Sequence, residues 1–226
     1  MAIVQHFDVD SFRTEKGKTL KITFIKHGSL LFDYEGHTLY VDPVSTYADY
    51  SKLPKADFIL VTHEHSDHLD AKAIADVEKK TTTIIINESS QKKLGKGTVM
   101  KNGDKLQPAA WLHIKAVPAY NTTPDRKKFH PEGRDNGYLL NIDGICVYVA
   151  GDTEDIPGMS HLGKVDIAFI PVNQPYTMTV PQAVHAAKMI KPHILYPYHY
   201  GDTPIQQLKD KLSGVSDIEV RIRQLQ

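Results

Sequence analysis

Short runs of apolar, often β-branched residues recur along the first half of the chain, and turn residues separate them. Residues 20–25, 30–34 and 38–41 form three such runs, spaced as in an antiparallel meander. A fourth run, residues 58–62, is apolar at nearly every position, which is typical of a strand buried on both faces. The pattern therefore predicts a β-meander followed by a buried strand.

The period of the pattern then changes from that of a strand to that of a helix. Residues 70–80 carry apolar side chains at helical spacing, with Asp70 in the position of an N-cap. Residues 119–136 show no periodicity and form the longest predicted loop. Further strands are predicted at residues 82–86, 98–101 and 112–117.

The second half repeats the order of the first. Residues 138–142 and 145–149 flank Asp143-Gly144, a dipeptide typical of a two-residue hairpin. Residues 180–190 are predicted as a helix because their apolar positions follow a helical period. The remaining predicted elements are strands at residues 165–170, 194–198 and 219–222 and a helix at residues 205–212.

A meander followed by alternating helices and strands in each half predicts the α+β class. The expected architecture is a four-layer αβ/βα sandwich, with two facing mixed sheets and helices outside. The sequence contains no repeat, low-complexity tract or linker, so we predict a single domain over residues 1–226. Residues 1–18 form an N-terminal extension whose order the pattern leaves open.

Composition narrows the class of protein. Hydrophobic residues make up 41% and charged residues 24% of the 226 positions, as in an ordinary globular protein. Lys+Arg and Asp+Glu are both 27, and this neutral total disfavours a nucleic-acid or anionic-membrane binder. The sequence has neither an apolar run of membrane-spanning length nor a signal-peptide pattern, so we expect a cytoplasmic protein. The single cysteine, Cys146, excludes an intramolecular disulfide and a Cys-based zinc site.

The most informative chemical feature is a cluster of histidines directly after the predicted buried strand. Four metal-binding side chains fall within six residues, namely His63, His65, Asp67 and His68. In extended chain His63 and His65 point the same way, and the following turn carries the other two to the neighbouring side. Imidazole and carboxylate groups suit zinc, manganese or iron without any thiolate. The cluster therefore predicts parts of two adjacent metal sites.

This H-x-H-x-D-H motif resembles that of the metallo-β-lactamase superfamily of metal-dependent hydrolases. The branch that it resembles most holds the L-ascorbate-6-phosphate lactonases and other metal-dependent hydrolases. Residues 41–43 match the family's strand-ending aspartate, residues 151–153 its Gly-Asp-Thr segment, and residues 196–201 its closing His motif. Residues 24–29 resemble the branch's early Gly-His-Ala-Ser turn, although Lys26 replaces the glycine.

The resemblance implies that the chain binds two divalent metal ions, zinc by preference and manganese or iron as alternatives. The first ion would take His63 and His65, the second Asp67, His68 and His199, and Asp152 would bridge both.

One position departs from the family pattern. The family's first metal usually takes a third histidine from the loop before the second-half hairpin, where this chain has Asn121. His130 lies in the same loop, and an imidazole nitrogen is a better ligand than an amide oxygen. We therefore favour His130 as the third ligand, with Asn121, a water or a weakened first site as the alternatives.

Other residues are expected to support the site or to contact the substrate. Asp42 is predicted to accept a hydrogen bond from the distal N–H of a metal-bound histidine. His27 is a candidate for the mouth of the site or simply a turn residue, and Asn121 is a further candidate pocket residue. Arg126 and Arg134 lie in the same loop as His130 and are candidates for recognising a phosphate.

These features favour a metal-dependent hydrolase in which a metal-bound hydroxide attacks an ester, lactone or phosphoester. Asp67 is the candidate catalytic residue, because it is placed to orient the hydroxide. The expected partner is a small-molecule substrate that carries or lacks a phosphate, and the oligomeric state stays open. Two alternatives are a nucleic-acid phosphodiesterase and a non-catalytic metal-binding protein of the same fold, the latter suggested by Asn121.

Overall fold

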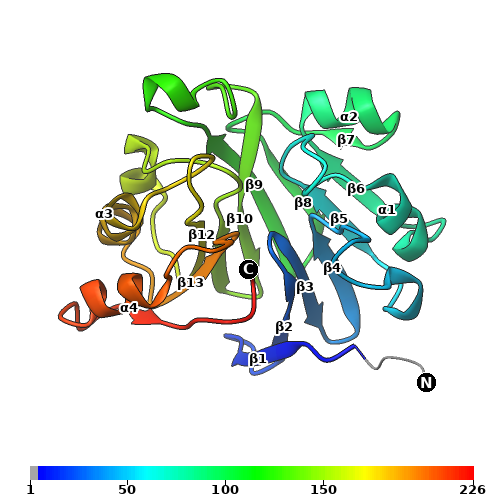
Figure 1. Ribbon diagram of the computed structural model, residues 1–226. Coiled ribbons are helices and arrows are strands. Elements are labelled where there is room, and N and C mark those ends of the chain that lie inside the picture. The colour runs from blue at the N-terminus through cyan, green and yellow to red at the C-terminus, as the bar shows by residue number, and fades with distance from the viewer. Residues whose placement is uncertain (1–4) are drawn as a thin grey trace.

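Two seven-stranded sheets face each other, with helices on their outer faces, in the computed structural model, which describes residues 5–226 (Figure 1). The first half of the chain contains β1 (Asp8–Arg13), β2 (Thr19–Lys26), β3 (Ser29–Tyr34), β4 (His37–Val41), β5 (Phe58–Val61), α1 (Ala71–Val77), β6 (Thr83–Ile86), α2 (Glu88–Leu94) and β7 (Thr98–Val99). The second half contains β8 (Lys105–Ala109), β9 (Leu112–Ala119), β10 (Asp135–Ile142), β11 (Ile145–Val149), β12 (Ile167–Pro171), α3 (Val180–Ile190), β13 (Ile194–Tyr198), α4 (Gln206–Leu212) and β14 (Glu219–Val220). Short 3-10 turns occur at Tyr50–Lys52, Pro124–Arg126 and Pro157–His161.

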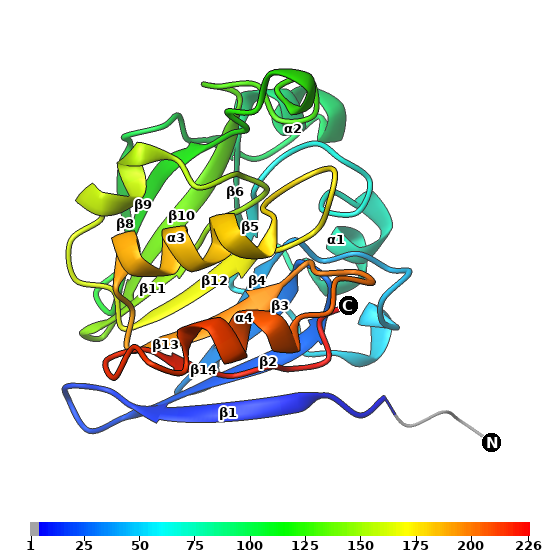
Figure 2. The same cartoon turned by 60° about the vertical axis from the view of Figure 1, so that its left-hand side comes forward.

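Each half of the chain builds one sheet by the same rule. The first sheet has the strand order β1 to β7, antiparallel up to β4 and parallel beyond it. The second sheet has the order β14 to β8, with β8 to β11 antiparallel and β11 to β14 parallel. In Figure 2, α3 and α4 cover the outer face of this second sheet. The predicted four-layer α+β sandwich is thereby confirmed.

Strand β5 shows why the sequence folds into layers. Phe58 and Leu60 belong to the large core between the two sheets, whereas Ile59 and Val61 belong to the smaller core beneath α1. Side chains alternate between the faces of a strand, so a strand that is covered on both faces must be apolar throughout. The continuous apolar run thus correctly predicted a strand buried on both sides.

Capping residues set the ends of two helices. Asp70 accepts hydrogen bonds from the backbone N–H groups of Lys72 and Ala73 at the start of α1, as predicted. Thr179 and Gln182 form a capping box at the start of α3, whose bounds agree with the prediction. α1 ends at Val77, earlier than expected.

Three elements were not predicted, and each has a weak hydrophobic pattern. β1 is an edge strand with exposed Val9, and α2 buries only Ser90. β8 alternates poorly and contains a proline. The predicted N-terminal extension is thus partly strand, since β1 pairs with β2, while residues 1–4 lie outside the described residues.

In the described part of the chain, none of the helices has the length and apolar character needed to cross a membrane.

Candidate metal centre

Several strands end at one edge of the sandwich, and each is followed by a candidate metal ligand. The H-x-H-x-D-H segment follows β5, Asp152 follows β11, and His199 follows β13. His130 comes from the long loop before β10, and His27 from the turn between β2 and β3. Both sheets therefore contribute to one cluster of side chains.

The carboxylate of Asp152 lies at the middle of this cluster. Its Oδ2 is 3.2 Å from His199 Nε2, 3.4 Å from His130 Nε2 and 3.9 Å from His63 Nε2. Its Oδ1 is 3.4 Å from His68 Nε2. A carboxylate has two oxygens, so Asp152 is placed to contact two cations at once.

The candidate ligand atoms form overlapping groups, and within each group they lie within 4.8 Å of one another. The groups are His63, His65 and His130; His27, Asp67, His68 and His199; and His63, His68 and Asp152. The structure thus brings together all seven residues predicted to bind metal, and it adds His27. The grouping also separates the two predicted sites, with Asp152 beside both.

The residues present fit divalent cations. Within residues 5–226, the buried atoms without a hydrogen-bond partner include Nε2 of His63, His68 and His199 and Oδ1 of Asp152. A buried polar atom without a partner costs free energy, and such atoms are uncommon in folded proteins. Here they face one another around a shared centre, where a cation would coordinate them.

Asp42 and Thr62 hold two of these histidines from behind. His68 Nδ1 donates to Asp42 Oδ2 at 2.7 Å. Thr62 donates through its backbone N–H to Asp42 Oδ1 at 2.8 Å and through its hydroxyl to Oδ2 at 2.7 Å. The Thr62 hydroxyl oxygen lies 3.0 Å from His63 Nδ1 and accepts from it. Both rings therefore carry their proton on Nδ1 and turn Nε2 toward the centre.

Asp135 lies behind His130 as Asp42 lies behind His68. This role of Asp135 was not predicted from the sequence. His130 Nδ1 donates to Asp135 Oδ2 at 3.1 Å, so its Nε2 faces Asp152. Arg134 donates through Nε to the other oxygen of Asp135 at 2.7 Å. No motif or spacing in the sequence distinguishes Asp135 from other loop aspartates.

Burial keeps part of the cluster neutral. It lowers the pKa of His63 well below the ordinary value, and the neighbouring His68 lowers it further. Burial, together with His130, also lowers the pKa of His65. At neutral pH both imidazoles are therefore in the uncharged form that binds metal.

Carboxylates have the opposite effect on His68 and His199, since they raise the pKa of both histidines. Burial alone would lower the pKa of His68 and His199, but Asp152 and neighbouring carboxylates outweigh it. They raise the pKa of His68 to about 9 and that of His199 to about 10. In turn, these histidines outweigh the effect of burial on Asp152 and hold its pKa well below the ordinary value. In the metal-free protein, protons thus supply the positive charge that cations would supply.

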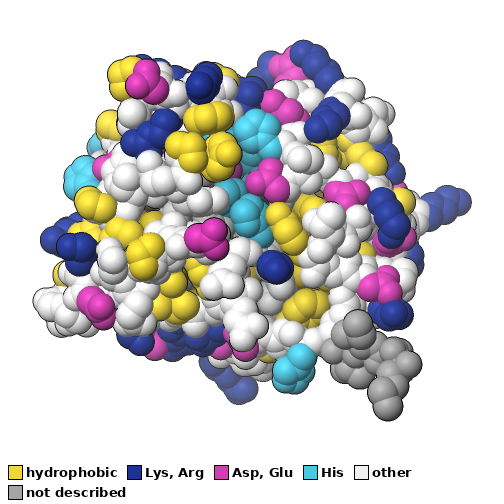
Figure 3. Space-filling view, viewed as in Figure 1, with side chains coloured by type: hydrophobic (Ala, Val, Ile, Leu, Met, Phe, Trp, Pro, Cys, Tyr) yellow, Lys and Arg dark blue, Asp and Glu magenta, His cyan; other side chains and the backbone are white. Residues whose placement is uncertain are grey.

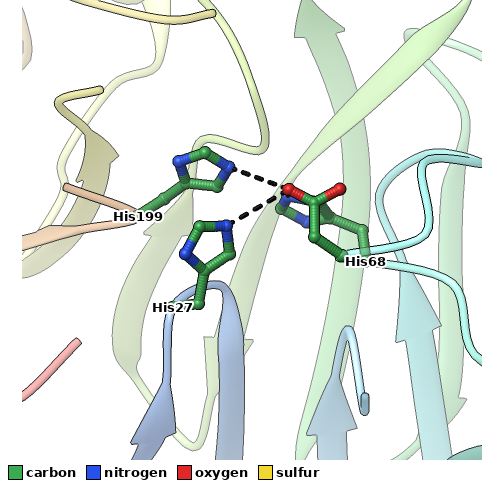
Figure 4. A group of neighbouring side chains, drawn as sticks. His27, His68 and His199 are labelled. Carbon is green, nitrogen blue, oxygen red and sulfur yellow. Dashed lines mark hydrogen bonds and ion pairs between the residues drawn. The ribbon is translucent and has the colours of Figure 1, made fainter. Parts of the chain in front are cut away.

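His27 points toward the cluster (Figure 4). Its Nε2 lies 3.2 Å from Asp67 Oδ2, and its ring centroid lies 3.7 Å from that of His199. His27 has a φ of 57°, and its carbonyl accepts from the backbone N–H of His199 at 3.2 Å. The turn between β2 and β3 is therefore bonded directly to the loop after β13.

A cavity of about 360 Å³ opens onto the cluster. Its lining comprises His65, Ser66, Asp67, Phe129, His130, Asp152, Tyr176 and His199. Figure 3 shows histidine side chains gathered at the middle of one face, beside a group of hydrophobic side chains. Phe129 and Tyr176 are the aromatic residues of the lining, and sequence analysis did not single them out.

Asn121 and His27, the further candidates for the pocket, are not among the residues that line this cavity. The Asn121 amide donates to the carbonyl oxygens of Arg126 at 3.1 Å and Tyr176 at 2.7 Å. Asn121 thus connects its own loop to the loop that contains Tyr176. His130, which lies in the same loop as Asn121, is among the candidate ligands.

Arg126 and Arg134, the candidates for recognising a phosphate, are both paired with carboxylates and are not among the residues that line this cavity. Arg126 Nε lies 2.9 Å from Glu154 Oε1, and its Nη1 donates to Gln174 Oε1 at 2.8 Å. Arg134 pairs with Asp135, and its Nη1 lies 3.1 Å from Glu64 Oε1. The charge of each arginine is thus already matched by a carboxylate.

Glu154 connects two ligand-bearing loops, and no sequence pattern indicates this role. It is fully buried two residues after Asp152. Besides pairing with Arg126, it accepts through Oε2 from the backbone N–H groups of Thr122 and Thr123, each at 2.7 Å. These bonds fix the loop that supplies His130 relative to the loop that supplies Asp152.

Comparison with known proteins agrees with this geometry. A family model described as the β-lactamase superfamily domain matches residues 21–199. A UPF0173 metal-dependent hydrolase of Pyrococcus abyssi is 32% identical over 198 residues, which is 82% of this chain and 86% of that protein.

Solved structures share the fold. A proposed metal-dependent hydrolase from Parabacteroides distasonis is 65% identical, with a TM-score of 0.96 over 98% of this chain and 100% of that one. Igni18, a metallo hydrolase of Ignicoccus hospitalis, is 24% identical, with a TM-score of 0.75 over 90% of this chain and 94% of that one. At that identity the second likeness concerns the fold alone.

Proposed function

The chain belongs to the β-lactamase superfamily and, within it, to the UPF0173 metal-dependent hydrolases, and on that premise we propose that it hydrolyses a small ester, lactone or phosphoester at a site for two divalent cations. The observation that carries the proposal is the set of buried, unpartnered ligand atoms around Asp152, found within residues 5–226. Such a set is costly to keep without a cation.

The proposed ligands follow the grouping of the side chains. One cation would take His63, His65 and His130, the other would take Asp67, His68 and His199, and Asp152 would bridge them. Zinc suits this set best because imidazoles predominate, while the carboxylates also admit manganese or iron. His27 lies close enough to the second group to be a further ligand.

Two adjacent cations would lower the pKa of a bound water toward neutrality and polarise the attacked oxygen of the substrate. Asp67 lines the cavity, and 39% of its side chain is exposed, whereas Asp152 is buried. Asp67 is therefore placed to accept a hydrogen bond from the attacking water and to orient it. Asp42 and Asp135 keep the histidine rings turned toward the centre.

The test combines metal analysis with assays of generic substrates. We expect the zinc- or manganese-loaded protein to contain two ions per chain and to hydrolyse at least one ester, lactone or phosphodiester. Asp67→Ala should lower kcat by about 100-fold or more, the scale of a lost proton-transfer or orienting group, when it is assayed at a metal concentration that saturates the weakened second site. A loaded protein with two ions and no activity on any of the three substrate classes would instead favour a non-catalytic metal-binding protein.

The structure gives the two alternatives no added support. The non-catalytic reading was motivated by Asn121, and His130 now lies among the candidate ligands instead. A nucleic-acid phosphodiesterase would need unpaired cationic side chains near the site to bind the phosphate backbone. Arg126 and Arg134 are instead paired with carboxylates.

A further inference from the structure

We propose that the part of the substrate remote from the scissile bond is uncharged and flat, such as the aryl group of a carboxylic ester or lactone. The proposal rests on the hydrolase function proposed above and narrows its substrate class. It comes from the walls of the cavity rather than from the candidate ligands.

Besides the candidate ligands, two aromatic rings line the cavity and form what we call its aromatic wall. Phe129 belongs to the loop before β10, and Tyr176 to the loop after β12. Their ring centroids lie 5.1 Å apart with an interplanar angle of 70°. Large rings in this arrangement bind flat apolar groups by stacking and by excluding water.

Hydrogen bonds from neighbouring side chains anchor the backbone at both aromatic residues. The amide of Asn121 donates to the carbonyl of Tyr176 at 2.7 Å. Arg134 Nη2 donates to the carbonyl of Phe129 at 2.7 Å. The backbone that carries each ring is therefore anchored before any substrate enters, which lowers the entropy cost of binding a flat group.

The same wall lacks what an anionic group would need. Among residues 5–226, the lining of the cavity includes no lysine or arginine. Arg126 and Arg134 are paired with buried carboxylates, and Lys128 lies over the Phe129 ring, 5.1 Å from its centroid, without lining the cavity. Apart from the candidate ligands, the lining offers a phosphate only the two rings and Ser66.

The experiment compares two esters that share the scissile bond and the leaving group. These are methyl phenylacetate and its 4-phosphonooxy derivative, assayed with the zinc-loaded enzyme, and methyl acetate serves as the substrate without a ring. We expect kcat/KM for methyl phenylacetate to exceed both others by about tenfold or more, the scale of one buried aromatic contact. An equal or higher value for the phosphorylated ester would overturn the proposal.

Variants connect this preference to the rings. Tyr176→Ala and Phe129→Leu should each raise KM for methyl phenylacetate several-fold, because each removes a stacking surface. Tyr176→Lys places a cation at a position that is 45% exposed, so it should move the preference toward the phosphorylated ester. Lys127→Ala, an exposed change in the same loop, should leave all three substrates unaffected.

A binding measurement separates this proposal from the hydrolase function. Saturation-transfer difference NMR with phenylacetamide should show transfer to its ring protons from the metal-free protein, and the two ring-removing variants should weaken it. If the loaded enzyme hydrolyses no ester but this transfer persists, the proposed function fails and the aromatic subsite stands. Equal transfer in the wild type and in both variants would overturn the subsite.

Discussion

Among individual residues, the orientation of each histidine ring depends on the group behind it. Asp42, Thr62 and Asp135 each contact an Nδ1 atom and leave Nε2 facing Asp152. Asp42 is fully buried, and burial raises its pKa, while the neighbouring His68 opposes that shift. His68 thus favours the charged form of the carboxylate that orients it.

Replacing this carboxylate should weaken metal binding. In Asp42→Asn the side chain keeps its shape but loses its charge, so His68 becomes a poorer ligand. We expect metal affinity to fall by about 10- to 100-fold, measured by competition with a chelator. Asp217→Asn, an exposed change, is the matched control. Unchanged affinity in Asp42→Asn would show that Asp42 does not support the ligand.

Gly28 is required by the close approach of His68. A Cβ at Gly28 would lie 2.8 Å from Cε1 of His68, closer than van der Waals contact allows. We expect Gly28→Ala to displace this ring and reduce the metal content of the purified protein, whereas Gly214→Ala, with open space around it, should not. Two tightly bound ions in Gly28→Ala would contradict this reading of the turn.

At the scale of elements, the bond network of Glu154 connects the long loop to the strand that carries Asp152. Glu154→Gln would keep the volume but weaken the pairing with Arg126 and the bonds from Thr122 and Thr123. We expect a loss of about 1–3 kcal/mol in the free energy of unfolding, measured with urea. Binding at the site that contains His130 should weaken more than binding at the other. An exposed change in the same loop, Glu132→Gln, should alter neither quantity.

Elements could be predicted where a local pattern fixes them. Helix α3 was predicted within its observed bounds because its apolar positions follow a helical period. The H-x-H-x-D-H segment could likewise be recognised as a metal-binding motif, because its candidate metal ligands are neighbours in sequence. α2 lacked such a pattern because only Ser90 is buried. Asp135 and Glu154 could not be found, because their roles depend on partners brought near by the loop and the sheet.

For the molecule as a whole, the cluster connects the two halves of the sandwich. His63, His65 and His68 follow a strand of the first sheet, whereas Asp152 and His199 follow strands of the second. Cations at this point would hold both sheets together, so metal binding should stabilise the folded protein by mass action.

The protons held by the metal-free cluster predict how stability changes with pH. His68 and His199 have pKa values raised to about 9 and about 10, above the 6.5 of an ordinary histidine. A proton bound more tightly in the folded state stabilises it fully below about pH 6.5, and this contribution is lost as pH rises through the folded pKa. His63, with its lowered pKa, is neutral in both states above pH 7 and does not change this slope.

We therefore expect the free energy of unfolding of the chelator-treated protein to fall between pH 7 and pH 10. The expected slope is on the order of 1.4 kcal/mol per pH unit for each retained proton. Urea denaturation at four pH values measures it. The metal-loaded protein should show a flatter profile, because the cations have already displaced these protons. A metal-free protein that becomes more stable over this range would contradict the assignment of charge.

Anomalous diffraction from crystals of the zinc-loaded protein tests the two-cation centre most directly, because it locates each ion and its ligands. The expected result is a pair of peaks, one on each side of the Asp152 carboxylate, with His63, His65 and His130 around one and Asp67, His68 and His199 around the other. Strong peaks that all lie away from Asp152, or none at saturating zinc, would contradict the centre on which the proposed hydrolysis depends.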